Sequence, residues 1–361
     1  MNFCLSTEMI DLHNQAPNRN QRECKYYWDE VCTLICGAGF KDIEIPYEPK
    51  WDFGGRSGIP RTLRSITTKF GTVSQYMEIL KHIGIDKISC IHLDPSMFCS
   101  GSMDMYFGAM EHFAREAIDF CEMAKVPVFT LTATPPIATV RALVGNTDGA
   151  GAASTVDGGT TGGAAAASTV GGGTAAGTAS LDAGASMPSA DTTFLEKNSA
   201  VIARLAAYAA SKNVTFCLKN EFWSLVRGQK LADYVKSIRS QYPDAPVMID
   251  ADTANLAIVG TDPAAFIREQ AGLIGAVHFS DTSFVDDCGA YASPSPEFPA
   301  GRATQIFKDL GQGNVDFPDI YKALETMDFK GPVVINAKQT RDFSRALLRA
   351  RYYIDHTLEA K

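Results

Sequence analysis

Short apolar runs alternate with longer amphipathic stretches along most of this 361-residue chain. Eight runs have the length and residue types of β-strands, at residues 2–8, 41–48, 87–94, 126–133, 214–221, 247–252, 275–281 and 331–338. Eight stretches have helical periodicity, at residues 19–40, 73–85, 106–126, 194–213, 228–242, 262–273, 317–329 and 343–360. This near alternation predicts an α/β fold, a (β/α)8 barrel. The alternative is an open doubly wound sheet, but no GxGxxG or GxxxxGK[ST] motif follows the first strand.

Residues 144–190 differ from the rest of the chain in composition, being mostly Ala, Gly, Ser and Thr. Such a tract has few large apolar side chains to offset the entropy that is lost on ordering. We expect a flexible low-complexity loop insertion, with ordered strands of small residues as the alternative. Because strand and helix patterns continue on both sides, residues 1–361 are predicted to form a single TIM-barrel domain.

The overall charge and the cysteines limit the function classes. A net charge of −8 argues against binding nucleic acid through the overall field of the protein. The nine cysteines are scattered singly, without a CxxC pair or a preceding secretory signal, which predicts reduced thiols and a cytoplasmic location. No apolar run reaches the length of a membrane span, so no membrane association is expected.

The strand at 214–221 ends in an unusual pair of charged residues. Alternation places Lys219 and Glu221 on the same face, together with Cys217. Lysine and glutamate are rarely buried unless they are paired or functional. The strand therefore ends either at a solvent-filled site or in an internal ion pair.

Polar residues also end the other predicted strands. They are Glu8, Glu44, Glu48, His92, Asp94, Thr132, Asp250, Asp252, His278, Asp281, Asn336 and Lys338. In a (β/α)8 barrel the carboxyl ends of the strands carry the catalytic groups. The sequence therefore predicts a cluster of oxygen and nitrogen ligands around one barrel mouth.

Three segments resemble a known family. They are VMIDADTANLAIVGTDP, AVHFSDT and LGQGNVDFPDIYKALETMDFKGPVVINA, and they are similar to segments of the xylose isomerase-like TIM barrels, the sugar phosphate isomerase/epimerase superfamily. The resemblance implies a divalent metal, often Mn, held by two Glu, one Asp and one His. Asp252 matches the Asp and His278 the His. The two Glu positions fall on Lys219 and Asn336, and a further histidine position falls on Asn255.

Three interpretations of these departures remain open. In the first, Glu221 replaces a missing carboxylate, and a metal (Mn, Mg or Zn) is bound more weakly by Asp252, His278 and Glu221. In the second, the Lys219 ammonium occupies the charge position of the metal and stabilises an oxyanion. In the third, the barrel has lost catalysis and serves as a binding protein or inactive subunit.

The remaining candidates are substrate-binding groups. Glu44 and His92 end early strands, where the family keeps such groups, although a structural hydrogen bond is the alternative for each. Trp223 and Trp51 are candidates for stacking on a sugar. Asn255, Asn336 and Lys338 are candidates for binding hydroxyl or anionic groups, and Arg302 and Arg341 for binding a phosphate or carboxylate.

The resemblance implies an isomerase or epimerase that acts on a sugar or polyol-derived ketone by proton transfer through an enediolate. Lys219, Glu221, Asp252 and His278 are the predicted catalytic residues. A lyase or dehydratase and a C-glycoside-cleaving enzyme are alternatives on the same barrel. The expected partner is a small carbohydrate, and a homo-oligomer is compatible with the family. An endonuclease is disfavoured because the chain has only six histidines.

Overall fold

The computed structural model describes residues 1–10, 24–52, 59–99, 101–145, 190–292, 306–338 and 340–360. Residues 146–189, which form nearly all of the predicted insertion, lie outside the described residues. The strands on the two sides of this segment, β4 (Val128–Thr132) and β5 (Thr215–Lys219), are direct neighbours and pair in parallel.

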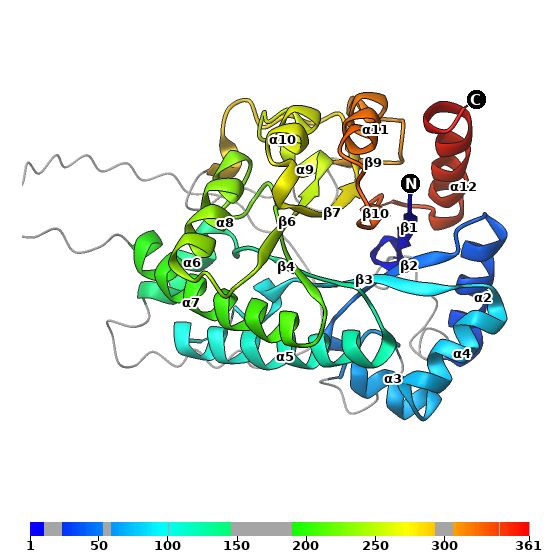
Figure 1. Ribbon diagram of the computed structural model, residues 1–361, viewed down its shortest axis with the longest axis horizontal. Helices are drawn as coiled ribbons and strands as arrows, with labels where there is room; N and C mark the ends of the chain where they lie inside the picture. The colour runs from blue at the N-terminus through cyan, green and yellow to red at the C-terminus, as the bar shows by residue number, and fades with distance from the viewer. Residues whose placement is uncertain are drawn as a thin grey trace, which may run out of the picture.

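Eight parallel strands close into a barrel, which confirms the predicted (β/α)8 architecture (Figure 1). All eight predicted strand positions are barrel strands. Besides β4 and β5 these are β1 (Phe3–Ser6), β2 (Asp42–Pro46), β3 (Lys87–Leu93), β6 (Val247–Asp252), β7 (Ile274–Phe279) and β10 (Val333–Ile335). The barrel closes where β1 pairs with β10, with Phe3 opposite Val333.

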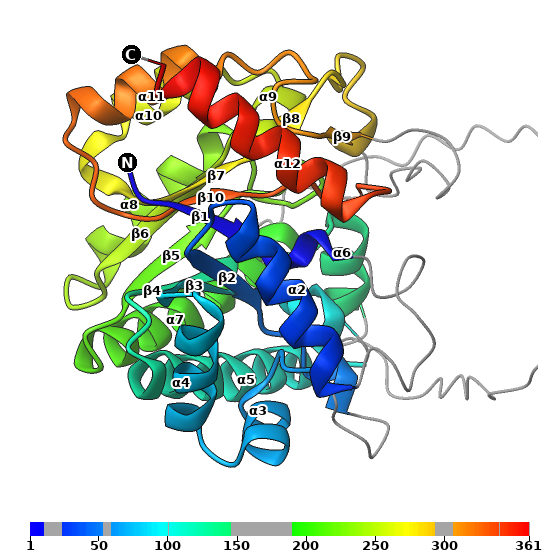
Figure 2. The same ribbon diagram turned by 90° about the vertical axis from the view of Figure 1, so that its right-hand side faces the viewer.

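Helices surround the barrel at the predicted positions. They are α2 (Lys25–Gly37), α4 (Val73–Ile83), α5 (Met103–Ala124), α7 (Ala190–Ser211), α8 (Gln229–Gln241), α10 (Pro263–Glu269), α11 (Phe317–Thr326) and α12 (Phe343–Tyr353). Figure 2 shows α12 beside α2, the helices that follow the last and the first barrel strand. Among the described residues, no helix combines the length and apolar character that crossing a bilayer requires.

Several short elements were not predicted from the sequence. They are α3 (Leu63–Phe70), α6 (Ile137–Gly145), α9 (Thr253–Ile258) and an antiparallel pair of two-residue strands, β8 (Asp281–Thr282) and β9 (Phe307–Lys308). Helices of one or two turns show too little periodicity to be recognised in sequence, and such helices depend on tertiary packing.

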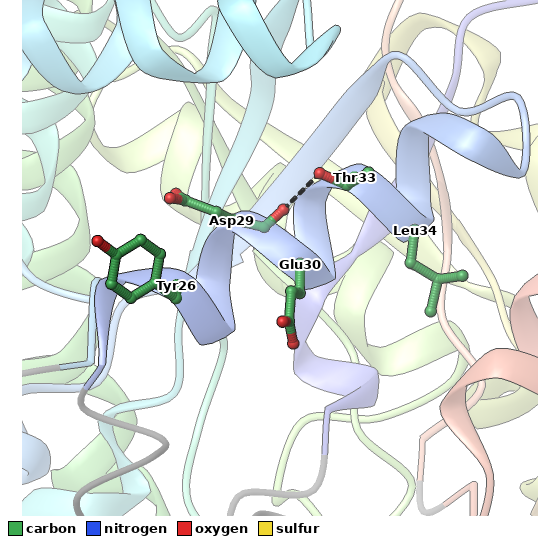
Figure 3. A pocket seen from close by; sticks show the side chains of 5 residues that line it. All are labelled: Tyr26, Asp29, Glu30, Thr33 and Leu34. Atoms are coloured by element: carbon green, nitrogen blue, oxygen red, sulfur yellow. Dashed lines mark hydrogen bonds between the residues drawn. The ribbon is translucent and has the colours of Figure 1, made fainter.

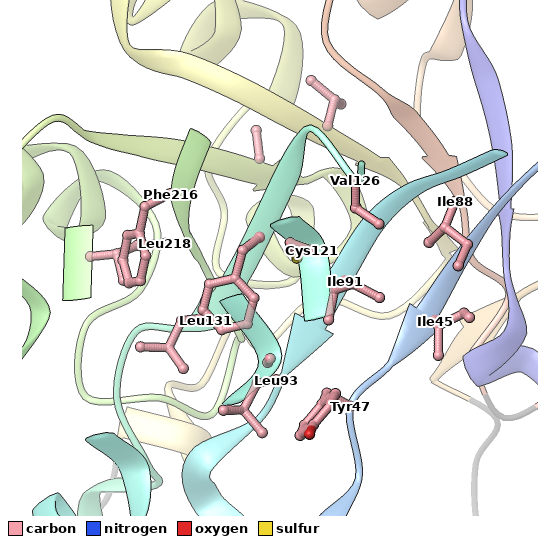
Figure 4. Packing of buried hydrophobic residues seen from close by; sticks show 14 of the residues in the cluster. Ile45, Tyr47, Ile88, Ile91, Leu93, Cys121, Val126, Leu131, Phe216 and Leu218 are labelled. Carbon is pink, nitrogen blue, oxygen red and sulfur yellow. The ribbon is translucent and has the colours of Figure 1, made fainter. Parts of the chain in front are cut away.

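The barrel strands bury both faces, as expected for an all-parallel sheet. On the outer face, Ile91, Leu131 and Leu218 are fully buried in the layer between strands and helices (Figure 4). On the inner face, one buried cluster consists of small and medium side chains, namely Cys4, Cys90, Val128, Cys217, Ala276 and Val334, with Met248 packed against them. The thiols thus act here as small apolar residues.

The interior changes from apolar to polar toward the carboxyl ends of the strands. Since side chains on one face recur every second residue, the next interior positions can be read directly from the sequence. They are Ser6 after Cys4, His92 after Cys90, Thr130 after Val128, Lys219 after Cys217, Asp250 after Met248, His278 after Ala276 and Asn336 after Val334. We call these polar residues at the carboxyl ends of the strands the mouth. It lies directly on the apolar inner cluster, which we call the floor.

Gly275, in β7, allows close packing at this floor. A Cβ atom at this position would lie 2.6 Å from the Sγ atom of Cys217 and 2.9 Å from the Cβ atom of Met248. We expect Gly275→Ala to lower the free energy of unfolding by about 1–3 kcal/mol, because the added methyl group overpacks the barrel interior.

Gly108, on the exposed side of α5, is the matched control because a Cβ atom there would meet nothing within 4 Å. Gly108→Ala should stabilise the protein by up to about 1 kcal/mol. Urea denaturation of both variants checks the expectation, and equal effects of the two substitutions would contradict it.

Candidate functional site

Lys219, the last residue of β5, lies at the centre of the polar mouth with its side chain fully buried. Its Nζ atom lies 3.4 Å from Oδ2 of Asp252 and 3.6 Å from Oε1 of Glu221. Both contacts are within ion-pair distance, but Nζ makes no hydrogen bond to any described residue. Burial alone would lower the pKa of Lys219, but the two carboxylates more than offset this and raise it well above its usual value. Lys219 is therefore protonated, and its ammonium group can still donate hydrogen bonds to a ligand.

Glu221 lies between two ammonium groups. Besides Lys219, the Nζ atom of Lys338 lies 2.5 Å from Oε1 of Glu221. Burial raises the pKa of Glu221, and the two lysines offset this effect only in part, so that the pKa remains above its usual value. A raised pKa favours a role for Glu221 as a group that exchanges protons.

Asp252, the last residue of β6, faces both the next helix and the mouth. It is the N-cap of α9, where its Oδ1 atom accepts a hydrogen bond of 3.2 Å from the backbone N–H of Asn255. The hydroxyl of Ser280 donates to the same oxygen. The other oxygen, Oδ2, faces Lys219 and has no hydrogen-bond partner among the described residues. Burial would raise the pKa of Asp252, but Lys219, Lys338 and His278 together lower it, so Asp252 is ionised.

His278, another residue of the mouth, is held between two carboxylates. Its Nδ1–H donates to Oδ1 of Asp250 over 2.8 Å, and Nε2 lies 2.9 Å from Oε2 of Glu44. Burial opposes a charged imidazole, but Asp250 and Glu44 outweigh it and raise the pKa of His278 to about 9. The hydroxyl of Ser6 donates to the second oxygen of Glu44 over 2.6 Å. His278 and Glu44 therefore form a charged pair within the mouth, and His278 is a cation at neutral pH.

Glu8 and Asn336 meet across the closing strands of the barrel. The Asn336 amide donates from Nδ2 to Oε2 of Glu8 over 2.7 Å, while the amide oxygen Oδ1 of Asn336 has no partner among the described residues. Burial would raise the pKa of Glu8, but Lys338 and Lys219 hold it well below its usual range. Sequence reasoning noted Glu8 at a strand end but did not assign it to the site, because the turn that follows β1 interrupts the period-2 pattern.

The other predicted substrate-binding residues surround this cluster. His92 contacts Thr132 through Nε2 over 3.0 Å, and burial together with Lys219 lowers the pKa of His92 to about 3, so it is neutral. Asn255 accepts a hydrogen bond from the backbone N–H of Phe222, and its Nδ2 atom has no partner among the described residues. Trp223 packs against the cluster that contains Phe222. The proposed sugar stacking by Trp223 stays a prediction.

Three further candidates from the sequence lie apart from this cluster or outside the described part of the chain. Trp51 donates from Nε1 to Oε2 of Glu48 over 3.0 Å. Arg341 makes no contact with the mouth residues that the structure records, and Arg302 lies outside the described residues. Their proposed roles stay predictions.

Asp281, the aspartate of the HFSD segment, has a structural role. Its carboxylate accepts hydrogen bonds from the backbone N–H groups of Thr282, Gly313 and Val315. A Cβ atom on Gly313 would lie 2.2 Å from Oδ1 of Asp281. The GQGN segment therefore requires a glycine at 313 because it wraps around this carboxylate.

A hollow on α2 is a weaker candidate for a functional site. It is lined by Tyr26, Asp29, Glu30, Thr33 and Leu34 (Figure 3). These residues belong to one helix and lie on the face opposite its buried side, and none of them contacts a residue of the mouth. The hollow therefore lacks the convergence of groups from several strands that the mouth has.

The residues at the four implied metal positions do not fit a divalent metal. Lys219 brings a positive charge where a ligand would donate electrons, and Asn336 brings only a neutral amide. Nδ1 of His278 is hydrogen-bonded to Asp250, while Nε2 lies 2.9 Å from Oε2 of Glu44 without a hydrogen bond. Only Asp252 and His278 therefore keep a ligand type that the resemblance implies. Within the described part of the chain, no three His, Cys, Asp or Glu side chains are grouped as metal ligands.

The raised pKa of His278 predicts a pH dependence of stability. The stabilisation from the protonated imidazole is fully present below the unfolded pKa of about 6.5 and is lost as the pH rises through about 9. Between these values the free energy of unfolding should fall by up to about 3 kcal/mol. In His278→Gln this dependence should largely vanish, as measured by urea denaturation at intervals from pH 6 to pH 9.5.

His82, an exposed residue of α4, provides the control for this experiment. His82→Gln should retain the wild-type dependence between pH 6 and pH 9.5. A wild-type stability that is flat over this window, or that rises, would contradict the charged His278.

Comparisons with known proteins agree with the fold. The family model described as "Xylose isomerase-like TIM barrel" matches residues 165–352, just over half of the chain. The inosose dehydratase of Clostridium beijerinckii is 25% identical over 130 residues, which cover 35% of this chain and 43% of that protein. The match thus spans less than half the length of this curated relative.

Solved structures share the fold at low sequence identity. A D-allulose 3-epimerase from Methylomonas sp. has a TM-score of 0.57 at 14% identity, covering 98% of this chain and 96% of that one. The probable 3-DHS dehydratase of Bacillus anthracis has a TM-score of 0.60 at 12% identity and covers 98% of both chains. The barrel, its order of strands and the family match establish that this chain belongs to the xylose isomerase-like TIM barrel family.

Proposed function

We propose that this protein is an enzyme that moves a proton at the carbon next to the carbonyl of a sugar or polyol-derived ketone, without a bound metal. The reaction would be an isomerisation or epimerisation through an enediolate. Family membership and structural similarity to sugar epimerases support this reaction class. Lys219 and Asn336 occupy two positions at which the resemblance implies metal-binding glutamates. Their presence there supports a reaction that does not need a metal.

The single observation that carries the proposal is a donor and an acceptor side by side at the base of the mouth. Nζ of Lys219 and Oδ2 of Asp252 lie 3.4 Å apart on fully buried side chains, and neither atom has a hydrogen-bond partner among the described residues. Buried polar atoms without partners are costly, and a bound ligand can satisfy them. An α-hydroxy ketone offers a carbonyl oxygen to the first atom and a hydroxyl to the second.

Lys219, Glu221 and Asp252 would each have a different role in the reaction. Lys219 would stabilise the negative charge that develops on the carbonyl oxygen, as a fixed cation in a water-poor site. Glu221, with its raised pKa, would take the proton from carbon and return it. Asp252 would hold the substrate hydroxyl and keep Lys219 in place. The neighbouring His278, Asp250 and Glu44 would help to hold these three residues in position.

Dehydration is the second candidate, and the pairing of Glu221 with Lys338 favours it. A carboxyl group with a raised pKa can protonate a leaving hydroxyl, so that loss of water follows formation of the enediolate. The similarity to an inosose dehydratase supports this candidate. The two reactions differ in the product, because dehydration lowers the mass by one water and epimerisation leaves it unchanged.

Hydrogen exchange tests the proposal. Wild-type protein incubated in D2O with D-allulose, L-ribulose and an inosose should incorporate deuterium next to the carbonyl of at least one of them. Glu221→Gln should slow this incorporation by about 10²-fold or more because the proton acceptor is lost. Lys219→Met should slow it by about 10²- to 10³-fold because the oxyanion loses its cation. Mass spectrometry and NMR measure the incorporation and the product mass.

Glu78, an exposed residue of α4, is the control for Glu221. Glu78→Gln should exchange hydrogen at the wild-type rate, and thermal denaturation confirms that each variant is folded. If wild-type protein binds these ketones but exchanges no hydrogen, the barrel is a non-catalytic binding protein. If it neither binds nor exchanges, the proposed substrate class is wrong.

Metal content tests separately whether Lys219 and Asn336 make the site independent of metal. Purified wild-type protein should contain far less than one equivalent of Mn, Zn or Mg, and its hydrogen exchange should resist chelators. Lys219→Glu combined with Asn336→Glu restores two carboxylates and should bind Mn²⁺ more tightly than the wild type, as measured by calorimetry and elemental analysis. One equivalent of metal in the wild type would sink the metal-independent mechanism.

A further inference from the structure

Carboxylates outnumber cations in the mouth. Among the described residues, the carboxylates whose charges act on this site are Glu8, Glu44, Asp94, Glu221, Asp250 and Asp252, and the cations are Lys219, His278 and Lys338. Six of these side chains are buried, namely Glu44, Glu221, Asp250, Asp252, Lys219 and His278, whereas Glu8, Asp94 and Lys338 are partly exposed. Among the buried groups alone, four carboxylates face two cations, so most of the excess is located where water screens it poorly.

Each of the three cations is already held by carboxylates. Lys219 faces Asp252 and Glu221, and Lys338 faces Glu221. His278 lies between Asp250 and Glu44, as described above. Lys219 has donor capacity left for a carbonyl oxygen of the substrate, but Asp252 and Glu221 already neutralise its charge in the resting site.

Glu8 and Asp94 have no ion-pair partner of their own within the described part of the chain. Glu8 receives the amide of Asn336, and Asp94 accepts the backbone N–H of Ser96 over 2.9 Å. Arg61, which donates to the backbone oxygen of the neighbouring Thr7, is paired with Glu48. None of these described cations of the mouth is thus left over for an anionic ligand.

The sign of the excess does not depend on individual protonation states. If Glu221 and Asp94 both carry protons, four carboxylates still face three cations. If His278 is neutral, the excess of negative charge becomes larger. The raised pKa values of Glu221 and Asp94, to which burial and neighbouring carboxylates contribute, are in keeping with a negative potential in this region.

We infer that the site takes a polyhydroxy carbonyl compound without an anionic group, either uncharged or amine-bearing, and discriminates against phosphorylated sugars. This inference rests on the proposed function and specifies its substrate class. A phosphate would bring negative charge into a region that already has an excess of it, and like charges placed together lower affinity strongly. An amine-bearing sugar would instead bring a counter-charge for the excess carboxylates.

A matched series of ligands tests the inference. Calorimetry should compare D-fructose, D-fructose 6-phosphate and 1-amino-1-deoxy-D-fructose on wild-type protein at low salt. The phosphate should bind at least tenfold more weakly than the neutral sugar, and the amine at least as tightly as the neutral sugar. In Glu8→Gln combined with Asp94→Asn, two negative charges are removed without loss of volume, so the discrimination against phosphate should shrink at least threefold.

Asp328, an exposed residue that pairs with Lys330, provides the control. Asp328→Asn should leave the discrimination unchanged. Phosphate binding as tight as, or tighter than, that of the neutral sugar overturns the inference. If hydrogen exchange occurs only with phosphorylated ketones, the proposed function stands and this inference fails. If none of the three ligands binds and no ketone exchanges hydrogen, both fail.

Discussion

The buried ammonium of Lys219 is the interaction on which the rest of the mouth depends. A charge without water is tolerated only when opposite charges surround it, and removing one partner of such a pair is strongly destabilising. Asp252 and Glu221 provide this compensation directly. Lys338 then balances part of the charge of Glu221. The protonation state of each group therefore depends on the charges of its neighbours. Lys219, Asp252, Glu221 and Lys338 act as one electrostatic unit.

Family membership accounts for the position of these groups at the carboxyl ends of the strands. The departures from the family pattern account for the different arrangement of charges in this mouth. Lys219 and Asn336 lie at positions where the resemblance implies carboxylates. Around them, Glu221 contacts Lys219 and Glu8 contacts Asn336, so a carboxylate lies beside each substituted position. The mouth thus has a carboxylate next to each of these two positions and a cation, Lys219, at one of them.

Much of this architecture could be predicted from the sequence because period-2 alternation in strands is a local property. The eight strands, and the placement of Lys219, Asp250 and His278 in the interior, follow from it. The partners of His278 could not be predicted, since Glu44 and Asp250 reach it from separate strands and only the closed barrel sets their distances. Glu8 was missed as a site residue for a similar reason, because a turn directs it toward Asn336. The short helix α9, which begins at its N-cap Asp252, was also missed.

The hydrogen bond between Asn336 and Glu8 joins residues that are 328 positions apart in the sequence. Lys338 comes from the same late segment and completes the surroundings of Glu221. During synthesis the mouth therefore cannot assemble until the last barrel strand has left the ribosome and paired with the first. Until then several carboxylates would be brought together without one of their cations, which disfavours early closure. Maturation of the site is thus linked to the final step of folding, and partly synthesised chains would lack it.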